Sequence, residues 1–449
     1  MDDLPPPLIL DVLSRLGDSA DLARCRVASK TFNSLSRDIR SINLHCSFDR
    51  YAKSRCPLTR SSITPFKTIL KNLVSELRIV ESVTIGIDKP LRTVSYDDVE
   101  DEDDDLYLTE VNFVGEWLPK VSDGLTSFSI SDFWVQSCWR RSEVLSLISS
   151  YCHKLAELQI RNAWLSVDGL KPMPKLSKLT LEYIRLDDED LNKVNESFPG
   201  LQVLNLIGVG GLKDPKIHLL QLKACRWTVS NAVYSVTIVA PNLVKLKLKC
   251  VRPRALVIET PSLADLHLSV EEASSFKVEE FVNLTNLHLE SLDLRRLLCS
   301  LPFGKTVKNL KLGLTKSSEL MGVSKFGFES LFSVFPNVSS LTFTPWAWSV
   351  FEMYICPEGD EIRSRMKGLK EITAYLEIHD FETTLSCIFS ILDNCSNLFE
   401  MKLFIHRDVV FHVTNTLISR CMTRHPRVIW RWGMWKEGTE DAWILDGVL

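Results

Sequence analysis

The sequence predicts an α/β solenoid, in which short parallel strands line a concave sheet and helical or irregular segments return the chain along the convex side. Two observations support this fold class. A six-residue pattern, L-x-x-L-x-L, recurs along most of the 449 residues, and its copies beginning at 243, 263, 284 and 307 are 20, 21 and 23 residues apart. Each unit has an apolar strand face and an apolar return segment that it cannot bury alone, so neighbouring units must stack to form a core.

The strands are placed by the repeated pattern itself. Its last two apolar positions are two residues apart, the period of a strand, so both point into the core. The clear copies begin at Leu155, Leu176, Leu201, Leu243, Leu263 and Leu284, and the weaker ones at Leu125, Val307, Val338, Leu369 and Leu398. The interval between 201 and 243 has room for two repeats, and we expect residues 233–238 to supply the missing strand.

Some return segments read as helices. Leu191, Val194 and Phe198 follow one another at helical spacing, so we expect a helix from 188 to 198. The following Pro199-Gly200 stops the helix just before the next strand.

The first forty residues have a different, purely helical pattern. Pro5 to Pro7 can open a helix, whose first turn does not need their missing amide donors. Ile9, Val12, Leu13 and Leu16 then share one apolar face, and Gly17 is a plausible stop.

Two further short helices are expected in this segment. Asp21 is a candidate N-cap for a second helix through Val27, and Ser29 for a third through Ser36. Three helices in so few residues bury little apolar surface, which indicates that the segment has a partner.

This N-terminal segment closely resembles the F-box. The residues that match its motif are Leu4, Pro5, Leu8, Ile9, Val12, Leu13, Leu16, Asp21, Leu22, Val27, Ser29, Lys30 and Phe32. Pro7 departs from the motif, which favours Glu there, and Phe32 stands where Trp is commonest. The repeats resemble the leucine-rich-repeat family over roughly 75–410, and their irregular lengths resemble the degenerate repeats of plant-type F-box proteins.

The resemblance implies the substrate-recognition subunit of an SCF-type (Skp-cullin-F-box) E3 ubiquitin ligase, a non-catalytic role in the cytoplasm or nucleus. The F-box would bind a Skp-type adaptor, and through it a cullin-RING ligase, while the repeats bind a target protein. The implied adaptor contacts are Leu4, Pro5, Leu8, Ile9, Val12, Leu13, Leu16, Val27, Lys30 and Phe32. Two alternatives remain open: a repeat scaffold that acts without ligase assembly, and an N-terminal helical segment that merely caps the solenoid.

Four segments follow from these patterns. We expect an F-box at 1–40, a linker with a first repeat-like strand at 41–74, leucine-rich repeats at 75–410 and a tryptophan-bearing C-terminal cap at 411–449. Within the repeats, the acidic run 97–105 repels itself and is expected to be a solvated, mobile insertion.

A candidate target-binding surface lies on the concave face, where residues that alternate with the buried leucines must point. Its members are Lys245, Lys247, Lys249, His267, His288 and Lys311. One hypothesis is that these side chains receive an acidic or phosphorylated segment of a target, with or without a small anionic co-ligand. The other is an ordinary solvated face, since neighbouring lysines repel one another only weakly in water.

Enzymatic and metal-binding motifs are not found. The twelve cysteines include no C-x-x-C pair, and the nine histidines include no H-E-x-x-H spacing, so we expect neither a cofactor nor a metal site. A net charge of −4 over 449 residues argues against nucleic acid or an anionic membrane as partner.

Overall fold

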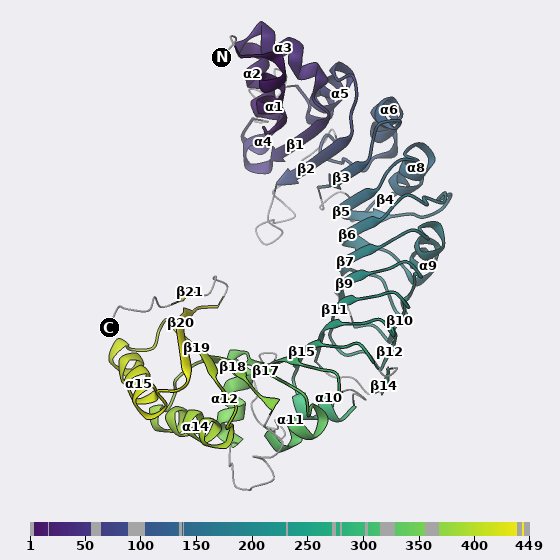
Figure 1. The fold of residues 1–449 in the computed structure, drawn as a ribbon. Coiled ribbons are helices and arrows are strands. Elements are labelled where there is room, and N and C mark those ends of the chain that lie inside the picture. Colours follow the sequence, from purple (N-terminus) through teal and green to yellow (C-terminus); the bar gives the residue numbers. More distant parts are fainter. Residues whose placement is uncertain are drawn as a thin grey trace. The chain divides into compact units, whose positions relative to one another are not determined.

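The chain folds into two compact units, Met1–Asn231 and Ala232–Leu449, each an α/β repeat structure (Figure 1). The computed structural model describes residues 4–16, 18–54, 64–88, 104–133, 137, 139–229, 232–271, 275–278, 281–300, 304–314, 328–354, 368–437 and 442–443. In this part of the chain, no helix is both long enough and apolar enough to cross a membrane.

The first unit begins with three short helices, α1 (Pro6–Ser14), α2 (Ser19–Ala28) and α3 (Lys30–Leu35). Ser29 caps α3, as expected, by accepting the N–H of Phe32 at 3.3 Å. The cap of α2 is Asp18, whose carboxylate accepts the N–H of Ala20 at 2.8 Å. Asp21, which the sequence favoured as that cap, lies in the first turn and pairs with Arg24. Gly17, the expected stop, is outside the described residues.

A parallel sheet follows these helices, and its strands pair in chain order. They are β1 (Ser41–Ser47), β2 (Ser82–Asp88), β3 (Ser127–Ser131), β5 (Glu157–Leu165), β6 (Lys178–Arg185), β7 (Val203–Val209) and β9 (Ala224–Val229). The short β4 (Arg141–Ser142) pairs with the end of β5. Helices line the outer side of this sheet in Figure 1: α5 (Phe66–Glu76), α6 (Val111–Val121), α8 (Val144–Tyr151) and α9 (Asp188–Ser197), the last where the sequence predicts it. The helix α4 (Phe48–Ser54) follows β1, and β8 (Lys216–His218) contacts α9.

The second unit repeats this plan. Its parallel strands, paired in order, are β11 (Lys245–Cys250), β13 (Asp265–Val270), β15 (Asn286–Ser291), β16 (Asn309–Leu314), β17 (Ser340–Phe343), β18 (Glu371–Leu376), β19 (Glu400–His406) and β20 (Ile429–Trp435). Parallel pairing therefore continues past residue 410 into the segment expected to be a cap. The antiparallel β21 (Ala442–Trp443) then pairs with β20.

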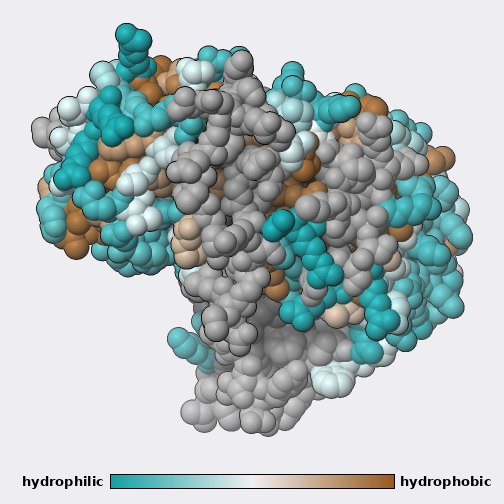
Figure 2. Space-filling view, turned by 90° about the horizontal axis from the view of Figure 1, so that it is seen from below, coloured by the Kyte–Doolittle hydropathy of each residue, from teal (hydrophilic) through white to brown (hydrophobic). Residues whose placement is uncertain are grey.

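Helices cover this second sheet only from α10 onward. They are α10 (Leu294–Ser300), α11 (Phe328–Val334), α12 (Pro345–Tyr354), α14 (Phe381–Asn394) and α15 (Phe411–Arg424). Trp348 of α12 is fully buried and packs edge-on against Phe343 of β17, with the two ring centroids 5.8 Å apart. Seen from below, the described surface mixes hydrophobic with hydrophilic side chains (Figure 2).

In the second unit, the return segments that precede α10 are strands, and they form a small second sheet. It contains β10 (Ser235–Val239), β12 (Ala255–Glu259) and β14 (Ser275–Val278), all parallel. This corrects one prediction: the stretch 233–238 belongs to this sheet, and the extra repeat strand after β7 is β9, with Cys225 and Trp227 buried. Both stretches alternate with period two, so the pattern predicts a strand but not its sheet.

The end of the acidic run is folded. Residues 97–103 lie outside the described residues, but Asp105 is 3% exposed and accepts the N–H groups of Phe66 and Lys67 at 2.8 and 3.0 Å. Asp104 pairs with Arg140 at 2.7 Å. The prediction of a wholly solvated run is therefore wrong for Asp105, because amide donors at the start of α5 need an acceptor and Asp105 supplies it. Asp104 remains partly exposed.

Candidate functional site

Exposed apolar side chains mark one side of the N-terminal helical segment. Leu8 and Val12, one turn apart on α1, are 54% and 50% exposed, and Leu4 just before the helix is 42% exposed. Residues four apart in a helix lie on the same side of it. Apolar residues gathered on one exposed side are typical of a protein-binding surface.

Two of the expected adaptor contacts instead form the core beneath this surface. Ile9 and Leu13 are 2% and 3% exposed and pack with Leu22 and Ile39. They neighbour Leu8 and Val12 in the sequence but point to the other side of α1, so they support the surface rather than take part in it.

The other expected adaptor contacts also include both partly buried and exposed residues. Leu16 and Phe32 are partly buried against the core cluster, so Phe32, where the F-box motif favours Trp, stabilises the helices. Pro5 and Lys30 are exposed, and Val27 near the end of α2 is 90% exposed. The candidate adaptor-binding surface therefore consists of Leu4, Pro5, Leu8, Val12, Val27 and Lys30.

The second candidate surface is the polar face of the main sheet in the second unit. Strand register aligns one row of side chains across it: Lys247, His267, His288, Lys311, Thr342, Thr373, Lys402 and Arg431. Along β11, Leu246 and Leu248 are buried, whereas Lys245, Lys247 and Lys249 are exposed, as the alternation predicts.

Charge is distributed unevenly along this row. At one end, Lys402 pairs with Glu371 and Glu400, and Arg431 also pairs with Glu400. At the other end, Lys245, Lys247, Lys249 and Lys311 form no ion pair within 4.0 Å among the described residues. A cavity of about 140 Å³ lies beside Lys311 and is also lined by Asn286, His288 and Asn309. Lysines outside any such ion pair are therefore concentrated on β11 and β16, with Asp265 of β13 opposite Lys245.

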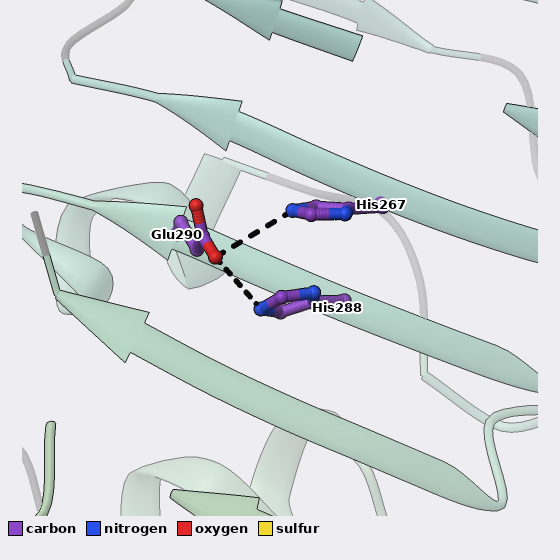
Figure 3. Close-up of side chains that lie close together, drawn as sticks. All are labelled: His267, His288 and Glu290. Carbon is purple, nitrogen blue, oxygen red and sulfur yellow. Dashed lines mark ion pairs between the residues drawn. The ribbon is translucent and has the colours of Figure 1, made fainter. Parts of the chain in front are cut away.

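His267 and His288 are not isolated side chains on this face. Their rings stack at 3.9 Å, and both Nε2 atoms lie near Oε1 of Glu290, at 3.6 Å from His267 and 3.0 Å from His288 (Figure 3). The two histidine side chains close to its carboxylate, His267 foremost, hold the pKa of Glu290 far below its usual range, and burial lowers the pKa of His288. The sequence placed both histidines on this face but did not predict that Glu290 would join them.

A larger cavity, of about 650 Å³, opens at the carboxyl ends of β18 to β20. Its lining combines apolar Val409, Val410 and Val413 with His379 and His406. These residues lie mostly in loops after the strands, where the repeat pattern carries no signal, so sequence reasoning missed this cavity.

Fold and surfaces together define an α/β repeat protein in which a helical segment with exposed apolar residues is joined to repeats with a polar face. A family model described as F-box-like matches residues 1–42. The F-box/LRR-repeat protein At4g29420 of Arabidopsis thaliana is 51% identical over 451 aligned residues, which cover 99% of this chain and all of that protein. The F-box protein AUF2 of the same plant is 25% identical over 296 residues, 63% of this chain and 91% of that protein.

This chain therefore belongs to the F-box/LRR-repeat proteins. The expected F-box at the N-terminus and the expected leucine-rich-repeat fold are both confirmed.

Proposed function

We propose that this chain is the substrate-recognition subunit of an SCF-type E3 ubiquitin ligase. The F-box binds a Skp-type adaptor, and the adaptor joins the chain to a cullin-RING ligase. The observation that carries this proposal is the exposure of Leu4, Leu8 and Val12 within the segment that the F-box-like model matches. Three large apolar side chains facing water on one short helical segment favour a protein partner that covers them.

The proposed contribution of this chain to ubiquitin transfer is proximity. The chain itself is non-catalytic and needs no cofactor, because the chemistry belongs to its partner subunits. By holding a target near the ubiquitin-loaded enzyme, it raises the effective concentration of the target's lysines. Such a subunit acts in the cytoplasm or the nucleus.

The target is proposed to bind the polar face of the second unit. Lys245, Lys247, Lys249 and Lys311 supply positive charge that is not held in ion pairs within 4.0 Å among the described residues, which favours an acidic or phosphorylated segment. His267 and His288 contribute less to such binding than the sequence predicted, because their Nε2 atoms already face Glu290.

Co-purification tests the proposal. The wild-type chain, expressed with a Skp-type adaptor and a cullin, is expected to purify with both. A Leu4→Ala, Pro5→Ala double variant is expected to lose both while it still captures targets through its repeats. If the wild-type chain captures targets but no adaptor, the alternative of a repeat scaffold without ligase assembly replaces this proposal.

A further inference from the structure

The geometry of His267, His288 and Glu290 points to a divalent metal site, and we propose that these three side chains bind a transition-metal ion such as Zn²⁺. They are the one group of three or more His, Cys, Asp or Glu side chains in the described part of the chain whose ligand atoms all lie within 4.8 Å of one another. Imidazole nitrogen and carboxylate oxygen are ligands that zinc prefers, and two histidines with one glutamate form a known ligand set for zinc.

The spacing of the ligand atoms fits a tetrahedral ion. Zinc bonds of about 2.0–2.2 Å place neighbouring ligand atoms about 3.3–3.5 Å apart. Oε1 of Glu290 lies 3.0 Å from Nε2 of His288 and 3.6 Å from Nε2 of His267 (Figure 3). Because the two imidazole rings are stacked, they must rotate for both Nε2 lone pairs to point at one ion. With three protein ligands, a fourth position stays open for water.

Neighbouring strands build this arrangement. The register of β13 against β15 sets His267 beside His288, and Glu290 follows His288 by two residues on the same face of β15. Gly313 of β16, in register with Glu290, leaves the space that the glutamate occupies: a Cβ there would lie 2.7 Å from Cγ of Glu290.

The contacts among the three side chains leave their hydrogen-bonding capacity incompletely used. Nε2 of each histidine is buried and makes no aligned hydrogen bond, although Glu290 is close.

The charges around the site affect how tightly it can bind a metal ion. Lys247 and Lys311 occupy the flanking positions of the same row, so a bound cation is repelled by two ammonium groups. We therefore expect an open, reversible site that is weaker than a closed structural zinc site with four protein ligands.

Metal titration of the untagged full-length protein tests this inference. After treatment with a chelator, the wild type is titrated with Zn²⁺ by calorimetry, and with Co²⁺ to read the visible absorption of a tetrahedral ion. One saturable ion per chain with a tetrahedral Co²⁺ spectrum is expected. Absence of saturable binding or of a tetrahedral spectrum would overturn the inference without any variant.

Variants then locate the site. His288→Gln and Glu290→Gln are each expected to weaken Zn²⁺ binding at least about tenfold, which corresponds to 1.4 kcal/mol. The matched control is His379→Gln, because His379 lies 3.6 Å from a single carboxylate, that of Glu377, and belongs to no three-ligand group among the described residues. Zinc should raise the Tm of the wild type and the control but not of the site variants. Equal affinity in all four proteins would show that the ion binds elsewhere.

Discussion

Arg26 of α2 forms an ion pair with Glu76, the last residue of α5, and the side chain of Arg26 is only 13% exposed while that of Glu76 is 46% exposed. A second contact crosses the same boundary, where the N–H of Asn43 in β1 donates to Oγ of Ser19 in α2 at 3.0 Å. The first repeat therefore fixes how the F-box helices sit in the first unit.

Removing Arg26, the more buried partner of the Arg26–Glu76 ion pair, should destabilise the F-box helices. Arg26→Ala is expected to lower the free energy of unfolding by about 1 kcal/mol, because Glu76 loses its partner and the packed stem of the arginine is lost. Hydrogen exchange of the α2 amides should become faster. The control is Arg24→Ala, whose pair with Asp21 is more than half exposed on both sides, and which should change stability by less than about 0.5 kcal/mol. Equal effects of the two variants would contradict this account of the junction.

A close approach between neighbouring repeats should make Gly211 sensitive to substitution. Its φ is +95°, and a Cβ there would lie 2.5 Å from the carbonyl oxygen of Leu186. Gly211→Ala is expected to lower the free energy of unfolding by about 2–3 kcal/mol in urea denaturation. Gly169→Ala shares the positive φ, +74°, but its Cβ would meet nothing within 4 Å, so it should cost about 1 kcal/mol. Similar losses in both would rule out the steric part of this explanation.

Asp132 should make stability fall as pH rises between about 4 and 6. Its carboxylate accepts N–H groups from Leu108, Thr109 and Phe133, yet complete burial outweighs these bonds and raises its pKa to about 6. The folded state then binds more protons than the unfolded state, in which the pKa is 3.8, so deprotonation over this range disfavours folding. The loss is on the order of 3 kcal/mol.

The contribution of Asp132 is isolated by comparing how the unfolding free energy changes with pH in two variants. Asp132→Asn should flatten the decline in unfolding free energy between pH 4 and 6, whatever its absolute stability. Asp168→Asn should leave the decline in place, because a hydrogen bond from Lys193 lowers the pKa of Asp168 instead. An unchanged slope in Asp132→Asn would show that another group is responsible.

Charge on the polar face of the second unit should govern target capture. Lys247→Glu combined with Lys311→Glu is expected to weaken capture about tenfold, or 1.4 kcal/mol, and more at low salt, because exposed charges are screened by ions. Lys277→Glu reverses an exposed lysine on β14, in the other sheet of the same unit, and should leave capture unchanged. Capture that is indifferent to the double reversal would exclude this face as the binding surface.

The repeat strands could be predicted because their signal is local. Leu246 and Leu248, or Leu287 and Leu289, occupy alternate positions of a strand, and burial of one face requires that pattern. The exposed residues of α1 were recognised in the same way, from a motif contained in one helix. The burial of Ile9 and Leu13 could not be predicted, because a motif does not say which of its apolar residues form the core.

What could not be predicted depends on residues far apart in the chain. Asp105 accepts amide groups about forty positions earlier, and nothing near it in the sequence indicates this. Glu290 meets His267 only because two repeats lie in a particular register, and because Gly313 on a third strand leaves space. The sequence alone does not predict which residues of neighbouring strands lie opposite one another.

Adaptor binding by the exposed side of α1 is tested most directly by titrating a purified Skp-type adaptor into the full-length chain. The wild type should bind one adaptor per chain. Leu8→Asp with Val12→Asp should weaken binding at least about 100-fold, or 2.7 kcal/mol, while circular dichroism shows the fold unchanged. Phe411→Asp, at a 76% exposed residue of α15, should bind like the wild type. Failure of the wild type to bind, or equal binding by the double variant, would contradict the assignment of this chain as an SCF substrate receptor.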